Sequence, residues 1–348
     1  MDQFYAAVEI RDNPALRGKA VIIGSDPQGG KGRGVVSTAS YEARKFGVHS
    51  AMPISQAWRL CPHGVYIRGN MDKYAAVSEQ IFEIFESVTP LVEGLSLDEA
   101  FLDVTQSRLL FGDAETVARS LKLRILKELG LVVSVGIAAN KSVAKIASDL
   151  KKPDALVIVP AGTEIEFLRP LPLKKLWGIG PKAEELLAGL GLNIVGDLQD
   201  YPVDALRERF GEHALGLHEL SMGLDSREVA PEREAKSIGR ETTFEEDCRD
   251  GELLRATLAS LCEEVSRRLR RHEFRAAQLS LKLRWTGFET HTRQQKLDPA
   301  SNHGPDFFSA AEPMLQHFLG KDRRSVRLIG IQAKIPPKTP AMRYRNQC

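Results

Sequence analysis

Residues 95–104, Leu-Ser-Leu-Asp-Glu-Ala-Phe-Leu-Asp-Val, place two adjacent carboxylates, Asp98 and Glu99, inside an otherwise apolar, alternating segment. The alternation predicts a strand or hairpin of a mixed sheet, with Gly94 supplying the turn that leads into it. An unpaired carboxylate in such a setting costs several kcal/mol, so we expect the pair to face a cation or a basic partner, or to lie at an open sheet edge.

Mg²⁺ is the cation that this pattern favours, because it is usually held by one or two carboxylates together with substrate phosphates. The segment therefore indicates a phosphoryl-transfer site. A hairpin with a solvated acidic tip is the alternative, since adjacent strand residues normally point to opposite faces of a sheet.

With 348 residues, the chain is long enough for two or more domains with sizeable cores. Its longest apolar runs fall well short of the ~20 residues that span a bilayer, and the N-terminus lacks a charged-then-apolar signal, so we expect a cytoplasmic protein without a membrane partner. The four cysteines are scattered, which argues against a disulfide framework and against a structural zinc site.

The net charge of +2 conceals an asymmetry along the chain. Residues 1–235 carry 27 Lys and Arg against 32 Asp and Glu, a net charge of −5, whereas residues 236–348 carry 21 against 14, a net charge of +7. A basic C-terminal part is typical of a protein that grips nucleic acid through one module, although a surplus of this size also occurs on ordinary solvated surfaces.

The segment 40–47 predicts a short helix that Gly47 closes as its C-cap. Tyr41 and Arg44 are three residues apart and share one face of that helix. An aromatic hydroxyl beside a guanidinium suits phosphate oxygens, because Arg binds them in a planar fork. A solvated face with Tyr41 half buried is the alternative.

The region around the carboxylates alternates between helical and strand patterns. In chain order these are an amphipathic helix at 72–89, the carboxylate hairpin, a helix at 114–129, a strand at 131–137 and a helix within 138–147. This order predicts a ferredoxin-like α+β layer. Lys141 falls in the first turn of the last helix, where backbone N–H groups and a cation can together meet an anion.

Residues 159–222 change character to short helices rich in Leu and Gly. The sequence Trp-Gly-Ile-Gly-Pro-Lys places Gly178 and Gly180 in a hairpin between helices, followed by Pro181 at a helix start and by Lys182. Such a helix-hairpin-helix lets backbone N–H groups approach a phosphate and binds DNA without reading bases. A plain pair of helices joined by a turn is the alternative.

A polar stretch at 223–235 reads as an inter-domain linker, and a second small α+β domain follows it. Its expected strands lie at 236–244, 277–284 and 325–335, and its expected helices at 253–271 and 307–319. The strand at 277–284 alternates apolar residues with Lys282 and Arg284, which puts cations on an exposed sheet face. The tail after Pro336 is expected to be disordered.

Six blocks of this chain resemble, in order, the Y-family translesion DNA polymerases, and within that family the bacterial DNA polymerase IV branch. The blocks are DQFYAAVE at the N-terminus, STASYEARKFGV, SLDEAFLDV, NKSVAKIASDLKKP, WGIGPK and KSIGRETTF. Together they span nearly the whole chain, so a chance match of all six is improbable.

The resemblance implies an α+β right-hand fold with a ferredoxin-like palm, small fingers, a helix-hairpin-helix thumb and a C-terminal α+β little finger. The implied boundaries are 1–3 and 71–158 for the palm, 4–70 for the fingers, 159–222 for the thumb, 223–235 for the linker, 236–336 for the little finger and 337–348 for the tail.

The resemblance also assigns roles to residues. Asp98 and Glu99 would be the catalytic, metal-binding carboxylates for two Mg²⁺ ions. The incoming dNTP would meet Tyr5 as a steric gate against a 2′-hydroxyl, together with Phe4, Thr38, Tyr41, Arg44 and Lys141. Primer–template DNA would be held by Gly178, Gly180, Lys182, Lys282 and Arg284.

Two departures from the family pattern accompany the resemblance. Family members place a first strand and a catalytic aspartate directly before the residue that aligns with Met1, so we expect the chain as written to be N-terminally truncated and impaired rather than naturally inactive. Asp2 corresponds to the second acid of that Asp-x-Asp pattern. The C-terminal end lacks the Gln- and Leu/Phe-rich peptide that docks on a sliding clamp.

The expected function is error-prone, template-directed DNA synthesis past lesions by a monomer, using two-metal phosphoryl transfer and no proofreading. A non-catalytic family member that binds primer–template as a scaffold is one alternative. A nucleotide cyclase, which also places carboxylates on a ferredoxin-like palm, is the other, although a helix-hairpin-helix and a basic C-terminal domain have no role in a cyclase.

Overall fold

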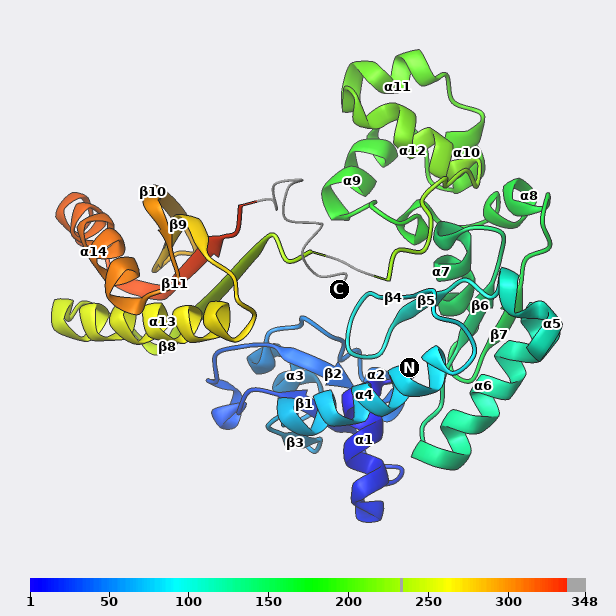
Figure 1. Cartoon of the computed structure of the whole chain (residues 1–348), viewed down its shortest axis with the longest axis horizontal. Helices are drawn as coiled ribbons and strands as arrows, with labels where there is room; N and C mark the ends of the chain where they lie inside the picture. Colours follow the sequence, from blue (N-terminus) through cyan, green and yellow to red (C-terminus); the bar gives the residue numbers. More distant parts are fainter. Residues whose placement is uncertain (232–233, 337–348) are drawn as a thin grey trace, which may run out of the picture. The chain divides into compact units, whose positions relative to one another are not determined.

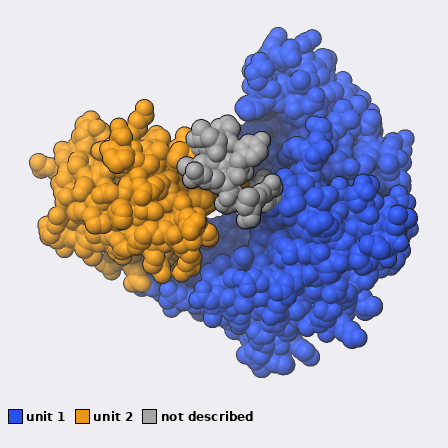
Figure 2. Space-filling view, viewed as in Figure 1, with its two compact units in different colours: residues 1–31, 35–232 blue, residues 32–34, 233–348 orange. Residues whose placement is uncertain are grey.

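The computed structural model describes residues 1–231 and 234–336. The predicted disordered tail at 337–348 lies outside the described residues. Figure 1 shows the chain as a ribbon, and Figure 2 colours its two compact units. The first unit comprises residues 1–31 and 35–232, and the second comprises residues 32–34 and 233–348.

The N-terminal part of the first unit is built on a three-stranded sheet of order β2-β1-β3. Its elements are α1 (Phe4–Asp12), η1 (Pro14–Leu16), β1 (Val21–Gly24), η2 (Gln28–Gly30), β2 (Val36–Ala39), α2 (Tyr41–Arg44), α3 (Ile54–Leu60) and β3 (Val65–Ile67). The predicted helix at 40–47 is present but stops at Arg44, and Ser40 caps it by accepting a hydrogen bond from the Ala43 amide.

The predicted ferredoxin-like segment follows. Its elements are α4 (Met71–Glu86), β4 (Val92–Gly94), β5 (Ala100–Leu102), η3 (Thr105–Ser107), α5 (Arg108–Phe111), α6 (Ala114–Leu129), β6 (Val135–Ile137), α7 (Lys141–Leu150) and β7 (Leu156–Ile158). The apolar stripe of α4, with Tyr74 and Ile81 fully buried, packs into the core as its periodicity predicts. Asn70, Asp113 and Asn140 cap α4, α6 and α7 through their side-chain oxygens.

The strands of this segment pair in two short ladders, antiparallel β4-β5 and parallel β6-β7. The first two residues of the chain bond to the turn between β4 and β5 and to the segment before β6. The Met1 amino group donates to the Asp98 carbonyl at 2.7 Å, and the Asp2 amide donates to the Val132 carbonyl at 3.0 Å. The strand predicted at 131–137 is regular only from Val135, because residues 131–134 are outside the ladder.

The remainder of the first unit is helical and has its own core, which includes Leu168, Leu187 and Leu198. Its elements are α8 (Glu164–Leu168), η4 (Leu173–Lys175), α9 (Pro181–Gly189), α10 (Val195–Gln199), α11 (Val203–Phe210) and α12 (His213–Ser221). Gly180 is the N-cap of α9 and Pro181 its first residue, as the hairpin sequence predicts.

The second unit is a four-stranded antiparallel sheet of order β10-β9-β11-β8 with two helices packed on it. Its elements are β8 (Ser237–Cys248), α13 (Gly251–Arg271), β9 (Ala276–Trp285), β10 (Thr290–Ser301), α14 (Gly304–Lys321) and β11 (Val326–Lys334). Its core includes Trp285 and Phe307. Sequence reasoning missed β10, because this edge strand is polar on both faces and shows no alternation.

Candidate functional site

The carboxylate pair lies at the tip of the β4-β5 hairpin, at the end of the turn and next to the first residue of β5. The amide of Leu95 donates to the Glu99 carbonyl at 2.8 Å and closes this tip. The Ser96 hydroxyl donates to Asp98 Oδ1 at 3.0 Å. Asp98 and Glu99 precede the regular strand, so the opposite-face rule for adjacent strand residues does not apply to them.

Both carboxylates are partly exposed and each faces an ammonium group. The side chains of Asp98 and Glu99 are 23% and 36% exposed. The amino group of Met1 lies 3.3 Å from Asp98 Oδ2, and Lys145 Nζ of α7 lies 2.6 Å from Glu99 Oε1. Each carboxylate at the hairpin tip therefore faces a basic partner, which is one of the outcomes expected for such a pair.

A third carboxylate, that of Asp149 in α7, also faces basic side chains. Asp149 Oδ2 lies 3.4 Å from Lys145 Nζ, and Asp149 Oδ1 lies 2.6 Å from Lys152 Nζ. Burial alone would raise the pKa of the Asp149 carboxyl, but the hydrogen bond from Lys152 and the charge of Lys145 outweigh it and hold the pKa below its usual value. Sequence reasoning missed Lys145 and Lys152, whose spacing of four and three residues from Asp149 is the signal that places them together.

Tyr41 presents a buried hydroxyl that has no hydrogen-bond partner among the described residues. Burial, with a contribution from the charge of Asp2, raises the pKa of Tyr41 to about 12, so the hydroxyl stays protonated at neutral pH. The Arg44 guanidinium lies 4.9 Å from the centroid of the Tyr41 ring. The expected Tyr41–Arg44 face therefore forms, with an unused hydroxyl and an exposed cation beside it; Thr38 is half buried in the neighbouring strand β2.

Asp2 itself is engaged in the structure. It is buried, and its carboxylate accepts hydrogen bonds from the Ser134 hydroxyl at 2.8 and 2.9 Å and from the Asp154 amide at 2.8 Å. These donors are internal to the fold, so Asp2 anchors the segment that precedes β6.

Tyr5 lies beside the hairpin tip. Its ring stacks on Tyr74 with centroids 4.4 Å apart and planes 13° from parallel. Burial raises the pKa of Tyr5, and the nearby charge of Asp98 raises it further. Phe4, in contrast, is 4% exposed and packs in the core, so its side chain is not open to a ligand.

Lys141 is not part of the group at the hairpin tip. Its side chain is buried, with Nζ 2.7 Å from Glu93 Oε2 and 2.6 Å from the Glu228 carbonyl. The N-terminus of α7 already binds an anion, because the Ser142 amide donates to Asp225 Oδ2 at 3.1 Å. The expectation that Lys141 and this helix terminus meet a ligand anion is therefore corrected: the anions they meet are the protein's own carboxylates.

The hairpin before α9 presents backbone to the surface. Gly178 has φ +96°, and a Cβ on either Gly178 or Gly180 would meet no atom within 4 Å. Lys182 follows in the first turn of α9 and is exposed. Free space above two glycines and a helix N-terminus with a cation is the arrangement that accepts a phosphate backbone.

The second unit carries the cations of β9 on the polar face of its sheet. Lys282 Nζ lies 2.7 Å from Glu241 Oε2, and Arg284 Nε donates to Thr290 Oγ1 at 2.8 Å. Both side chains are partly exposed, as the alternation predicts.

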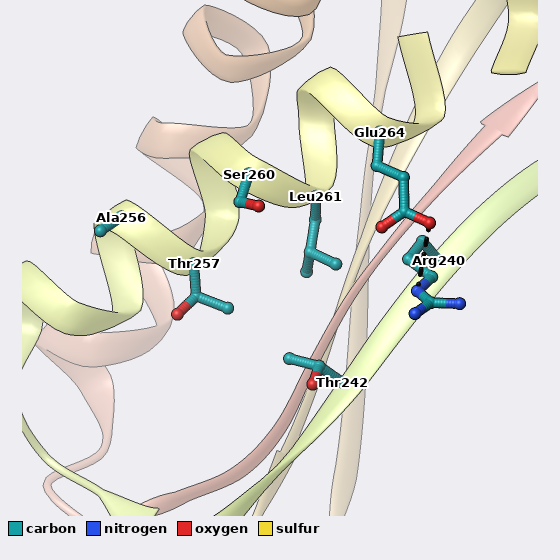
Figure 3. A pocket seen from close by; sticks show the side chains of 7 residues that line it. All are labelled: Arg240, Thr242, Ala256, Thr257, Ser260, Leu261 and Glu264. Atoms are coloured by element: carbon teal, nitrogen blue, oxygen red, sulfur yellow. Dashed lines mark ion pairs between the residues drawn. The ribbon is translucent and has the colours of Figure 1, made fainter. Parts of the chain in front are cut away.

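A hollow of about 410 Å³ lies between β8 and α13 of the second unit (Figure 3). It is lined by Arg240 and Thr242 of β8 and by Ala256, Thr257, Ser260, Leu261 and Glu264 of α13. The Arg240–Glu264 ion pair, 3.4 Å long, spans the two elements. None of these residues belongs to the cluster that Asp98 and Glu99 form with their basic partners.

The carboxylates at the hairpin tip fit a divalent cation. They are adjacent oxygen donors and are partly open to solvent, and a metal ion would replace the ammonium groups that now face them. Within residues 1–231 and 234–336, no group of three or more His, Cys, Asp or Glu side chains could hold a metal ion. A hard cation at Asp98 and Glu99 would therefore take further oxygens from a phosphate ligand.

None of the helices described in the structure is both long and apolar enough to cross a bilayer.

Comparisons with protein families match three parts of the chain. The impB/mucB/samB family matches residues 1–149, the C-terminal domain of that family matches residues 235–336, and the HHH motif of the IMS family matches residues 162–192.

Two curated relatives are similar over most of their length. DNA polymerase IV of Desulfatibacillum aliphaticivorans is 43% identical over 331 residues, covering 95% of this chain and 82% of the relative. DNA polymerase IV of Methanoculleus marisnigri is 44% identical over 332 residues, covering 95% of this chain and 91% of the relative.

Solved structures agree with these relatives. A Y-family DNA polymerase chimera, Dbh-Dpo4(243-245)-Dbh, has a TM-score of 0.87 and 29% identity and covers 96% of each chain. An insertion ternary complex of Dbh DNA polymerase has a TM-score of 0.67 and 29% identity and covers 97% of this chain and 98% of that one.

Proposed function

This chain belongs to the Y family of DNA polymerases, and from that membership we propose how its residues carry out lesion-bypass synthesis. The enzyme is a DNA-directed DNA polymerase of the translesion type that uses a divalent metal. The observation that carries the assignment of its site is the partly exposed Asp98–Glu99 pair at the tip of the β4-β5 hairpin, with Lys145 beside it.

We propose that Asp98 and Glu99 hold two Mg²⁺ ions together with the triphosphate of an incoming dNTP. When bound, the metal lowers the pKa of the attacking primer hydroxyl and neutralises charge on the leaving pyrophosphate. The carboxylates fix the position of the reacting oxygens, and catalysis of this kind depends almost wholly on position and charge. Lys145, whose Nζ lies 2.6 Å from Glu99 Oε1, would be in position to meet a phosphate oxygen of the same ligand.

The triphosphate would be bound by the cations near the tip. We assign Arg44 and the unpartnered Tyr41 hydroxyl to its oxygens, with Lys145 and Lys152 on the α7 side. Thr38 remains a proposed contact from the strand that precedes α2. Lys141, engaged by Glu93, has no direct role in this proposal.

Tyr5 would select the sugar. Its ring is backed by Tyr74, so it cannot retreat in that direction, and a 2′-hydroxyl placed against its edge would overlap it. Phe4 would contribute through its backbone, because its side chain is in the core.

Primer–template DNA would be gripped at two places. Backbone N–H groups at Gly178–Gly180 and the Lys182 ammonium would hold one strand, and the polar sheet face with Lys282 and Arg284 would meet phosphates of the duplex. The net charge of +7 on residues 236–348 supports this role.

The two alternatives are weaker. The family matches cover the helix-hairpin-helix and the C-terminal domain, which a nucleotide cyclase does not need. A non-catalytic scaffold gives no reason for two adjacent, partly exposed carboxylates at the hairpin tip. A monomeric state and docking on a sliding clamp are proposed on the sequence alone.

A primer-extension assay tests the proposal. The protein is incubated with a labelled primer–template, Mg²⁺ and each dNTP in turn. Extension by the complementary nucleotide supports polymerase chemistry, binding without extension supports the scaffold, and a cyclic nucleotide formed without DNA supports the cyclase.

A further inference from the structure

Residues 223–230, here called the strap, run from the end of α12 toward the second unit and were expected to be a polar linker. Hydrogen bonds tie them to the rest of the first unit, of which they are part, at four points. The Gly223 carbonyl accepts a hydrogen bond from Asn140 Nδ2 at 2.7 Å, and the Asp225 carboxylate accepts one from the Ser142 amide at 3.1 Å. The other two points involve a buried ion pair.

The Lys141–Glu93 ion pair holds the distal half of the strap. Lys141 Nζ donates to the Glu228 carbonyl at 2.6 Å, and Glu93 Oε2 accepts a hydrogen bond from the Ala230 amide at 3.0 Å. The side chains of Lys141 and Glu93 are only 10% and 4% exposed. Each member of the pair thus also bonds to the backbone of the strap.

The strap also contacts the DNA-binding hairpin. The Arg227 guanidinium lies 4.7 Å from the centroid of the Trp177 ring, and Asp225 fixes its orientation through two hydrogen bonds of 2.7 and 2.8 Å. Trp177 directly precedes Gly178, and its other neighbour is Phe101 of β5, with ring centroids 5.9 Å apart.

These contacts converge on the base of the catalytic hairpin. Glu93 and Phe101 are direct cross-strand partners in the β4-β5 ladder, and Asp98 and Glu99 form the tip of the same hairpin. Lys141 completes the cluster, with its ammonium 5.6 Å from the centroid of the Phe101 ring.

We propose that the strap is a positioning element, which ties the hairpin at Trp177–Gly180 to the base of the hairpin that carries Asp98 and Glu99. Arg227 and Glu93 are its positioning residues: neither touches substrate, and each acts through Trp177 or through the strap backbone. The proposal rests on the function proposed above, since it deepens the account of how DNA is aligned with the carboxylates.

The test compares Arg227→Ala, Arg227→Lys and Glu93→Gln in the full chain. Hydrogen exchange of the amides of residues 223–230 reports the strap without any activity. We expect faster exchange in Arg227→Ala and Glu93→Gln and near-normal exchange in Arg227→Lys, because lysine can still pair with Asp225 and lie over Trp177. Arg119→Ala, which removes an exposed ion pair on α6, is the matched control.

Steady-state kinetics supply the second measurement. The two disruptive variants should raise the KM for primer–template by between about tenfold and about a hundredfold while kcat changes less, because misplacing a binding element is costly even far from the chemistry. Arg227→Lys should keep the KM for primer–template close to that of the unaltered protein. The slope of log affinity against log salt should stay unchanged.

Three results would overturn the proposal. One is unchanged exchange at 223–230 in both disruptive variants. The second is a salt slope that falls by ~0.9 in Arg227→Ala, which would make Arg227 a direct phosphate contact. The third is an equal effect of Arg119→Ala. If the unaltered protein neither binds nor extends primer–template, the proposed function fails, while the exchange experiment still decides whether the strap is held as described.

Discussion

Lys145 Nζ lies 2.6 Å from Glu99 Oε1, and one turn earlier in the same helix Lys141 Nζ lies 2.7 Å from Glu93 Oε2. Helix α7 therefore grips the β4-β5 hairpin twice, at its base through a buried pair and at its tip through an open one. The buried Lys141–Glu93 pair holds the hairpin in place. In the open Lys145–Glu99 pair, either side chain can leave its partner and bind a ligand.

Replacing Lys145 by Met should weaken nucleotide binding. We expect the KM for dNTP to rise by about tenfold or more, because a charge-assisted contact to phosphate is lost. Lys145→Arg should bring the KM for dNTP part of the way back to its normal value. Lys127→Met, on the exposed face of α6, should leave this KM unchanged. Single-nucleotide incorporation over a dNTP titration measures this, and an unchanged KM in Lys145→Met would remove Lys145 from the triphosphate site.

Tyr5→Ala should raise ribonucleotide incorporation while DNA affinity stays close to normal. The ring excludes a 2′-hydroxyl by overlap, so removing it opens the space. Tyr74→Phe is the control, since it keeps the stacked ring and loses only the hydrogen bond to Glu9, at a cost of about 1 kcal/mol of stability. Equal dNTP and rNTP discrimination in Tyr5→Ala and the unaltered protein would contradict the gate assignment, provided that thermal melts show both folded.

Gly178→Ala and Gly180→Ala should separate stability from DNA binding. Only Gly178 has a positive φ, so alanine there should cost about 1–2 kcal/mol of folding free energy. Alanine at Gly180 meets no atom of the protein, so it should cost less stability than alanine at Gly178, only the smaller penalty of alanine at a helix N-cap, but obstruct the approach of a DNA backbone. Chemical denaturation and DNA titration check the pair, and full DNA affinity in Gly180→Ala would exclude this hairpin from the interface.

Lys282→Gln and Glu241→Gln should change DNA affinity in opposite directions. Lys282 would meet a phosphate, so its loss should weaken binding and reduce the salt slope by ~0.9. Glu241 pairs with Lys282 at 2.7 Å and competes with that phosphate, so its neutralisation should tighten binding. Fluorescence anisotropy across a salt series distinguishes these effects; identical binding in both variants and the unaltered protein would place DNA elsewhere.

Much of this fold could be predicted because strong periodicity coincided with clear end signals. The helix at 114–129 has its predicted bounds, with Asp113 as its cap and Gly130 in the left-handed conformation after it. Strand β10 escaped prediction because an exposed edge strand has no buried face to impose alternation.

The residues of the candidate site could be predicted from the sequence only in part. The Asp98–Glu99 pair was identified because two charges in an apolar run are anomalous. Lys141 and Lys145 occupy the same face of α7 and look equivalent in the sequence, yet one is buried against Glu93 and the other is open at Glu99. Only long-range packing decides this, as it decides that the polar residues of the strap are bound rather than free.

The account depends most on Glu99 as a catalytic carboxylate. The direct test is the rate of single-nucleotide primer extension in Mg²⁺ by the unaltered protein and by Glu99→Gln, with Glu115→Gln, an exposed acid on α6, as the control. The account predicts that Glu99→Gln extends the primer at least about a hundredfold more slowly than the unaltered protein and the control do, at nearly unchanged DNA affinity. Extension by Glu99→Gln at the unaltered rate, or tight DNA binding by the unaltered protein with no extension, would contradict it.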